Sequence, residues 1–440
     1  MKKVLFLLTL AGFVVTACTS DFDGNFEVLS GETVTPLTRA VVNDSVALGE
    51  LVPLEVTEEM LEMKKLYDEW RSSQIELMAA SQIDEFFNVN MVSIKDLPVT
   101  IQVRTIAAGS TADYDYLTCS GTQKEVKLGK QSSSDDNLFY VKKQSALTGV
   151  PYLIYSKKSN TPLAVGYYEG KEEDKVLMSM KDNSNVNVTA GWDLYPSDAH
   201  RGYFSIQNEY YMGQADPSDI WSYFYYVLEA KSKNKIGYAQ RVANKGEQEF
   251  LITPINKFSI KNIDFDTDNA TLTSAAPITI TTTTDNIYEY PTSWNTDTVI
   301  TVTETSMFNE TKGYLNLQID PANVKFKRPE SVGGDVRVMQ DAVADAAYST
   351  TRENIEKDIE VPINIPALEP RSYADITITL KTFNITVPYT ATAEFEGHEV
   401  KVKGTWRGYA VADINYYKPE YSVKFTSLDS SPILAKSRRN

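Results

Sequence analysis

Histidine and cysteine are nearly absent from this sequence. Its 440 residues include two of each, and the histidines stand alone at His200 and His398. This scarcity argues against a His-rich metal site and against a histidine-based catalytic centre. The Gly-x-Ser-x-Gly, P-loop, His-Glu-x-x-His and Cys-x-x-Cys motifs do not occur either. We expect no enzyme, no metal and no cofactor, with a glycosidase carboxylate pair such as Asp264 and Asp266 as the minor alternative.

Positive charge is also scarce. The chain has 43 Lys and Arg residues against 59 Asp and Glu, which gives a net charge of −16. Nonspecific binding to nucleic acid needs a basic surface, and so does long-range attraction to anionic lipid. The sequence therefore predicts no nucleic-acid partner.

The N-terminus has the pattern of an export signal. Lys2 and Lys3 precede an apolar run, Val4–Val15, that is too short to span a bilayer. The following Val15–Cys18 stretch resembles a bacterial lipobox, which implies cleavage before Cys18 and a lipid on its thiol. A plain signal peptide is the alternative. Because Thr19 rather than Asp follows, the resemblance implies the outer membrane.

Two acidic residues refine this destination. Asp21 and Asp23 resemble the export tags of surface-exposed lipoproteins, which places the protein at the cell surface, lipid-anchored or released. With Cys18 lipidated, Cys119 has no partner for an internal disulfide. Stability must then come from the core.

One segment has helical periodicity. Between Thr57 and Ser81 an apolar stripe recurs at helical spacing, with Thr57 as N-cap and two glutamates in the first turn. We expect this helix to pack under the next domain, with a partner-binding helix as the alternative. The stripe consists of Met60, Met63, Tyr67 and Trp70.

From about 92 to 254 the chain repeats itself. The openings Tyr116–Cys119, Tyr152–Tyr155 and Tyr203–Ile206 align, and each copy closes with an aromatic-led strand. Three β-units that cannot bury their apolar faces alone predict a three-fold closed arrangement. The closing strands are Leu138–Val141, Trp192–Pro196 and Phe250–Thr253 with Pro254.

Two phrases of the repeat resemble the ricin-type β-trefoil lectins. Gly191–Pro196 followed by Arg201–Asn208 matches their core-Trp strand and the strand after it. The resemblance implies that Trp192 and Phe250 are core residues. It also implies a glycan site that pairs an Asp with an exposed aromatic; the alternative is that these aromatics pack on a neighbouring domain. The candidates are Tyr210, Tyr211, Asp216, Asp219 and Trp221.

After Pro254 the strands become longer and rich in Thr. Alternating stretches at 258–266, 277–286, 359–366, 376–381, 383–389, 400–404 and 408–414 predict strands, and Phe395–His398 predicts a hairpin turn. Pro362 and Pro366 lie inside one pattern, which places that strand at an edge.

Residues 255–415 resemble the aerolysin and epsilon-toxin family of pore-forming proteins. The resemblance rests on an ordered set of stretches. It implies a receptor-bound homo-oligomer in which each subunit contributes one amphipathic hairpin to a membrane barrel. The stretches are Asn262–Asp266, Pro277–Ile280, Lys325–Pro329, Val361–Ala367, Asn384–Tyr389 and Gly404–Gly408.

The resemblance places the insertion hairpin at about Phe308–Tyr348, with its tip at Phe326–Gly334. The tip is polar here, and the return limb contains an Ala-rich stretch, Met339–Ala347, that a helix would also accommodate. A half-buried soluble sheet is the alternative for the whole pattern. The hairpin residues are Leu315, Leu317, Ile319, Val324, Phe326, Pro329, Val332, Val336 and Val338.

The expected fold is mainly β: a β-trefoil, then an aerolysin-like antiparallel module, with one N-terminal helix. The expected function is a lipid-anchored, glycan-binding pore former; the alternative is a surface glycan-binding or adhesion lipoprotein that makes no pores. The expected parts are a signal peptide (1–18), a tether (19–53), a helical segment (54–91), the lectin-like domain (92–254), the pore module (255–425) and a tail (426–440).

The anchoring hypothesis is tested at its thiol. Replacing Cys18 with Ala should abolish lipid modification and release the protein from the membrane fraction. Mass spectrometry of the mature N-terminus and detergent partition measure the two effects. Continued outer-membrane fractionation of the variant would contradict the lipobox interpretation.

Overall fold

The computed structural model describes most of the chain from residue 49 to residue 428. The chain divides into two units, Met1–Ala47 and Leu48–Asn440, and only the second contains described residues. It is mainly β with antiparallel sheets, as expected. Cys18 and the tether up to residue 48 lie outside the described part. The described ranges are 49–75, 85–143, 152–183, 188–197, 199–216, 219, 222–310, 315–320 and 324–428.

Six strands of the first half pair in a closed ring. The order β2–β5–β6–β9–β10–β13 returns to β2, and hairpins β3–β4, β7–β8 and β11–β12 leave the ring in the same place in each copy. Three copies of a four-strand unit predict this closure. The strands are β1 (Leu51–Pro53), β2 (Val99–Val103), β3 (Tyr114–Thr118), β4 (Lys127–Lys130), β5 (Phe139–Lys143), β6 (Tyr152–Ser156), β7 (Thr161–Tyr168), β8 (Lys171–Ser179), β9 (Gly191–Pro196), β10 (Tyr203–Gln214), β11 (Tyr223–Lys231), β12 (Lys235–Gln240) and β13 (Phe250–Pro254).

The alignment of the first copy was wrong by one strand. The strand at Tyr116 is β3, a hairpin strand, whereas Tyr152 and Tyr203 begin β6 and β10, which belong to the ring. The equivalent first strand is β2, Val99–Val103, which alternates buried and half-buried residues but has no leading aromatic. Because β2 has no leading aromatic residue, the aromatic-led repeat pattern does not identify it.

Helix α1 (Glu58–Ile75) begins where the capping pattern places it. The Met60 amide donates to Thr57 Oγ1 at 3.2 Å, which confirms the N-cap. Tyr67 meets Tyr225 of β11 edge-on at 5.1 Å, so this face of the helix packs on the β11–β12 hairpin. A second helix, α2 (Glu85–Ser93), buries Met91. Short 3-10 turns lie at Asp135–Asn137, Val188–Ala190, Gly246–Gln248 and Thr267–Asn269.

The second half forms a sheet in the order β18-β14-β25-β26-β17-β23, with β15 also pairing β25. Strand β23 is at the edge, as its prolines Pro362 and Pro366 predict. The strands expected at 400–404 and 408–414 belong to one continuous strand, β26. Gly408 does not break this strand; its missing side chain makes room for the buried ring of Trp406. The bounds are β14 (Lys257–Phe265), β15 (Thr271–Ser274), β17 (Thr292–Glu310), β18 (Gln318–Ile319), β23 (Glu353–Leu368), β25 (Thr382–Phe395) and β26 (His398–Val411).

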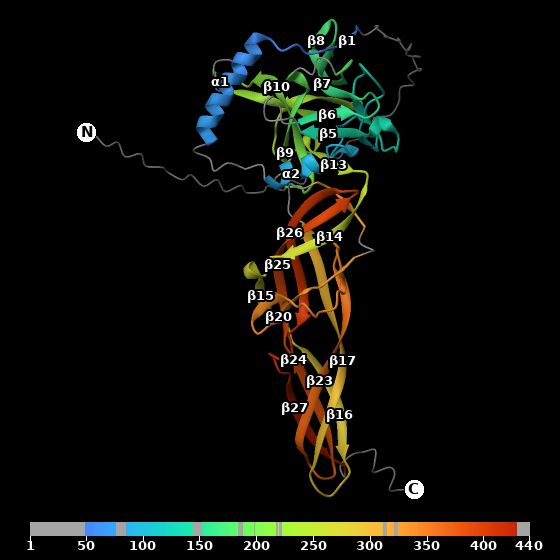
Figure 1. Ribbon diagram of the computed structural model, residues 1–440, viewed down its shortest axis with the longest axis vertical. Coiled ribbons are helices and arrows are strands. Elements are labelled where there is room, and N and C mark those ends of the chain that lie inside the picture. Colours follow the sequence, from blue (N-terminus) through green and yellow to red (C-terminus); the bar gives the residue numbers. More distant parts are fainter. Residues whose placement is uncertain are drawn as a thin grey trace, which may run out of the picture. The chain divides into compact units, whose positions relative to one another are not determined.

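A third sheet covers part of the second. Its order is β16-β24-β27, with β16 (Ile278–Asn286), β24 (Ser372–Leu380) and β27 (Glu420–Ser427) (Figure 1). Ile300 and Val302 of β17 and Ile363 of β23 alternate with exposed polar residues and face Ile376 of β24 in one buried cluster. A period of two therefore builds a two-layer core here.

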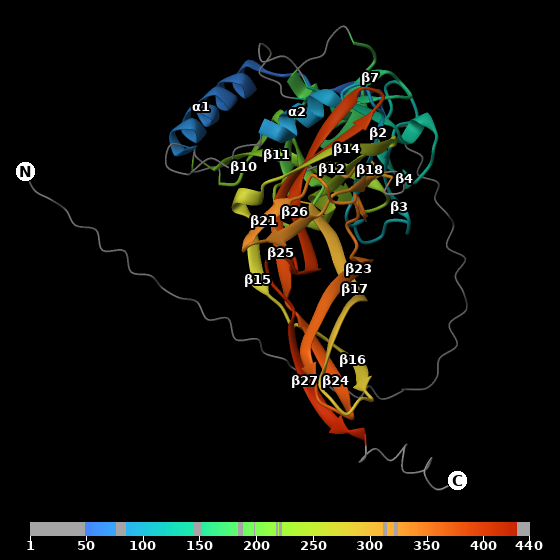
Figure 2. The same cartoon turned by 60° about the horizontal axis from the view of Figure 1, so that its bottom comes forward.

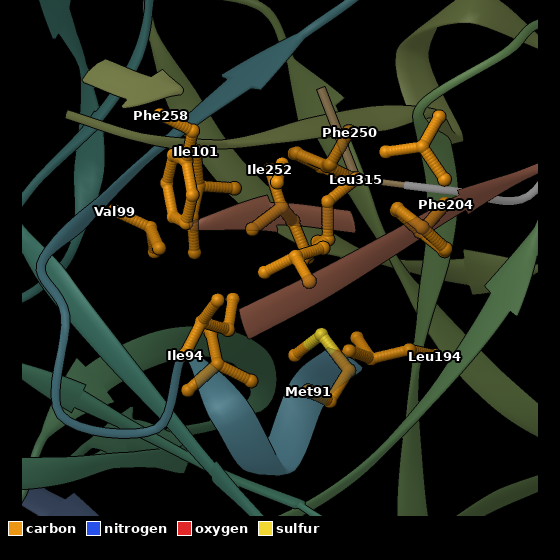
Figure 3. Packing of buried hydrophobic residues seen from close by; sticks show 14 of the residues in the cluster. Met91, Ile94, Val99, Ile101, Leu194, Phe204, Phe250, Ile252, Phe258 and Leu315 are labelled. Atoms are coloured by element: carbon orange, nitrogen blue, oxygen red, sulfur yellow. The ribbon is translucent and has the colours of Figure 1, made fainter. Parts of the chain in front are cut away.

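The ring has its own core, which also takes in residues from outside it. Phe250 and Ile252 of β13 lie in one cluster with Met91 of α2, Phe258 of β14 and Leu315, as Figure 3 shows. Figure 2 views the same ribbon from another direction and shows β14 close to β18, its parallel partner. The start of the second sheet therefore shares buried apolar contacts with the ring.

Trp192 is completely buried, as the sequence predicts for a core residue. Trp192→Ala should lower the free energy of unfolding by about 3–5 kcal/mol, because a cavity remains where the ring packed. Tyr290→Ala is the control, since Tyr290 is 60% exposed, and should change stability by less than about 0.5 kcal/mol. Denaturant titrations measure both. Equal effects would show that Trp192 is not a core anchor.

Candidate functional site: a clamped segment between two paired strands

The candidate site is the chain between β17 and β23, residues 311–352, which we call the linking segment. Its described residues form only short strands: β18, then β19 (Lys325–Phe326) paired with β22 (Ala346–Ala347), and β20 (Pro329–Val332) paired with β21 (Asp335–Val338). The turn expected here is confirmed, since Gly333 and Gly334 have φ of +62° and +95°. The long limbs expected on either side are not continuous strands in this structure.

Some apolar residues of the segment are buried in the core, and others are exposed. Leu315 is 1% exposed, whereas Val338 is 36% exposed. The Asn316 amide donates to the Ile252 carbonyl of β13 at 3.4 Å, and β18 pairs in parallel with β14. The predicted hairpin residues therefore lie partly in the core and partly at the surface. Pro329, Val332 and Val336 are buried, and Leu317, Ile319, Val324 and Phe326 are half-buried.

A buried guanidinium fastens the segment to β17. Arg328, 5% exposed, contacts Glu304 of β17 at 2.8 Å and binds Asp345 through two hydrogen bonds of 2.9 and 2.7 Å. Glu304 also accepts a hydrogen bond from the Val411 amide at 2.9 Å. Burial alone would lower the pKa of Arg328, but the hydrogen bonds of Asp345 and the charge of Glu304 raise it above its usual value. We call Arg328, Glu304 and Asp345 the arginine clamp.

A second polar contact lies at the end of the segment. The Tyr348 hydroxyl donates to Glu310 at 3.0 Å and lies 2.9 Å from the Tyr389 hydroxyl, while Glu310 also pairs with Arg201. The Tyr348 ring packs against Phe308 with centroids 4.6 Å apart. Burial, followed by the neighbouring Tyr389, raises the pKa of Tyr348 well above its usual value, so its hydroxyl stays protonated.

The candidate glycan residues do not form one exposed cluster. Tyr210 is 7% exposed, and Lys64 of α1 lies over its ring at 5.0 Å, while Tyr211 stacks on Tyr226 at 4.3 Å. Asp216 and Asp219 are exposed in the loop after β10, where the Ser222 hydroxyl bonds both of their carbonyls. Trp221 lies outside the described residues.

Glu209, next to Tyr210, shows why this stretch of β10 is not open to a ligand. Glu209 is buried and contacts Lys64 at 3.4 Å. Burial, with a further contribution from Asp193, raises the pKa of Glu209 to about 9. Lys64 and helix α1 cover this part of β10, so it offers no open sugar platform.

Two further kinds of site have no candidate in the part of the chain that the structure describes. It contains no group of three or more His, Cys, Asp or Glu residues that could hold a metal ion. None of its helices is both long and apolar enough to cross a membrane. Cys119 is buried as a free thiol. The sequence does not predict the clamp: Arg328 lies in the polar tip and Asp345 in the Ala-rich stretch, and nothing near either residue points to Glu304.

No protein-family model and no curated protein matches this chain. Similar solved structures include the lamprey immune protein, with 12% identity and a TM-score of 0.26 over 74% of this chain and 99% of that one. An aerolysin-like protein of Bombina maxima has 9% identity and a TM-score of 0.22 over 38% and 98%. Cry35Ab1 has 10% identity and a TM-score of 0.26 over 75% of this chain and 90% of that one. At these TM-scores the similarity fixes neither the topology nor the function of this chain.

The clamp can be tested by removing its cation. Arg328→Met should lower the free energy of unfolding by about 3–5 kcal/mol, because Glu304 is left buried without its counter-charge. Adding Glu304→Gln should restore part of the loss. Arg337→Met removes an exposed arginine of the same segment and should cost less than about 1 kcal/mol. Equal losses at Arg328 and Arg337, measured in urea, would rule out a clamp.

Proposed function

We propose that the chain is a β-pore-forming protein whose linking segment leaves the sheet and prolongs the β17–β23 pair into a membrane-crossing hairpin. The register of that pair supports this most directly. It stays constant from Trp294↔Ile365 to Ser306↔Glu353, so the segment joins two strand ends that are already paired. Straightening the segment would extend an existing ladder rather than build a new one.

The register assigns a partner to every residue of the extended hairpin. Leu315 would lie opposite Ala344 and Leu317 opposite Ala342, and the turn would fall at Pro329–Glu330. This turn lies within the tip expected from the sequence. Because side chains alternate between faces, Leu315, Leu317 and Ile319 share one face with Val336, Val338, Ala342 and Ala344. Val324, Phe326, Met339 and Val343 come to the opposite face.

The charges of the two limbs support a membrane-facing side. Within 313–323 and 336–346 the apolar face contains no ionisable residue, and Asp320, Arg337, Asp341 and Asp345 are all on the opposite face. The paired limbs are as long as the roughly 9–11 residues that a membrane strand needs. The lipid-facing residues would be Gly313, Leu315, Leu317, Ile319, Pro321 and Asn323 on one limb, and Val336, Val338, Gln340, Ala342, Ala344 and Ala346 on the other.

This arrangement also accommodates the polar tip and the acidic residues of the Ala-rich return limb. Asp341 and Asp345 are four residues apart, so a strand places both on the water-filled side, where charge costs little. Lys325, Lys327 and Arg328 lie near the turn and would emerge beyond the bilayer. A single hairpin leaves its strand edges unpaired in lipid, so the hairpins of several subunits must pair into a closed barrel.

We further propose that the first half is a lectin-like β-trefoil that binds a surface glycan, and that Cys18 anchors the protein to the bacterial outer membrane at the cell surface. The closed six-strand ring with three hairpins supports the trefoil. Asp216, Asp219 and Trp221 are the remaining sugar candidates, because Tyr210 and Tyr211 pack inside. The second candidate function is a glycan-binding adhesin in which the clamp never opens.

The two faces give a matched pair of substitutions. Val338 and Met339 are each 36% exposed, so either position should accept an arginine in the soluble protein. In the hairpin Val338 would face lipid, where an arginine costs about 2–4 kcal/mol, and Met339 would face water. Val338→Arg should abolish dye release from vesicles made of erythrocyte membranes, which carry surface glycans, and Met339→Arg should preserve it.

Unfolding curves of both variants control for damage to the soluble fold. If both release dye equally, the segment does not cross the bilayer in this register. If the unsubstituted protein binds these vesicles yet never releases dye, the pore proposal is wrong and the adhesin is favoured.

A further inference from the structure

Two arginines on the exposed face of the second sheet have no acidic partner. Arg407 is on β26, and Arg352 immediately precedes β23. No described carboxylate lies within ion-pair distance of either, whereas Arg104, Arg201 and Arg328 each contact one. In a chain of net charge −16, two unpaired guanidinium groups together are a local reversal of charge.

The carboxylates of Glu353 and Glu304 bind other groups. Glu353, next to Arg352 in sequence, accepts a hydrogen bond from the Ala347 amide at 3.3 Å. Glu304 is buried in the arginine clamp. The positive charge of Arg352 and Arg407 is therefore left facing solvent.

Both arginines line the same hollow. Its volume is about 320 Å³, and its walls include Met307 and the polar side chains of Thr386, Asn384 and Tyr409. In the ladder Arg407 lies opposite Met307 on one side and Thr386 on the other. Neighbouring strands are about 4.8 Å apart, so the hydroxyl of Thr386 is within reach of a group held by Arg407.

We propose that this hollow binds a phosphate group. Two guanidinium forks offer more donors than the two oxygens of a carboxylate can accept, whereas a phosphate presents three or four oxygens in a tetrahedron. Met307 gives the hollow an apolar floor, and Thr386 and Asn384 supply neutral donors at its wall. The group could belong to free phosphate or to a lipid headgroup, which have this chemistry in common.

The phosphate site does not depend on the pore. Neither arginine belongs to the apolar face of the hairpin, and binding is measurable without any membrane crossing. A protein that binds phosphate but releases no dye would retain the site and lose the pore, so the two proposals fail separately.

Calorimetric titration of the full chain with inorganic phosphate at constant ionic strength tests the site. Saturable binding is expected, weakened about tenfold or more by Arg407→Gln and by Arg352→Gln, since each removes charged hydrogen bonds. Arg241→Gln is the matched control: Arg241 is also exposed but lies over the Tyr195 ring, away from the hollow, and its loss should leave affinity unchanged.

Sedimentation with lipid vesicles distinguishes a lipid headgroup from free phosphate as the ligand. Phosphatidylcholine vesicles with and without phosphatidic acid are sedimented with the unsubstituted protein, Arg407→Gln and Arg241→Gln. Loss of sedimentation for Arg407→Gln alone assigns a lipid headgroup; phosphate binding without sedimentation assigns free phosphate. The proposal is overturned if neither probe binds, or if Arg407→Gln and Arg352→Gln bind as tightly as Arg241→Gln does.

Discussion

The ladder between β17 and β23 is the constraint on which the rest of the second half depends. Its constant register fixes which face each residue occupies, both in the strands and in any continuation of them. One face supplies Ile300 and Ile363 to the two-layer core, and the chain beyond Ser306 must leave this ladder to fold back. A one-residue slip would move the charges of the segment onto its apolar face, so the proposed hairpin requires this register.

The arginine clamp suits a contact that must hold and then open. Burying a guanidinium and a carboxylate costs desolvation, which their attraction offsets only while the geometry is complete. An apolar plug at the same place would keep its stabilisation until fully withdrawn. Arg328 instead regains hydration as soon as it parts from Glu304, and near the turn of the hairpin it would stay in water. Glu304 would stay buried without its counter-charge, so opening the clamp in the soluble protein is costly.

Features set by near neighbours in sequence could be predicted from it. Thr57 caps its helix, Gly333–Gly334 makes its turn, and the prolines of β23 put that strand at an edge, because each follows from local backbone chemistry. Pairings between distant residues could not be predicted. Nothing near Arg328 in sequence identifies Glu304, and nothing near Arg352 identifies Arg407. Tyr210 is buried among residues such as Leu153 and Met180, and Lys64 covers its ring from a helix far earlier in the chain.

Leu315 shows how one side chain can serve two environments. It is buried with Phe250 and Ile252 of the ring, and removing it to water would cost about 1.5–3 kcal/mol. In the proposed hairpin it would enter lipid, so that cost is recovered on insertion. Val338 is exposed in the soluble fold and would gain burial in the same step. Since Asn316 bonds β13, a strand of the ring, the ring and the segment must separate for this exchange to occur.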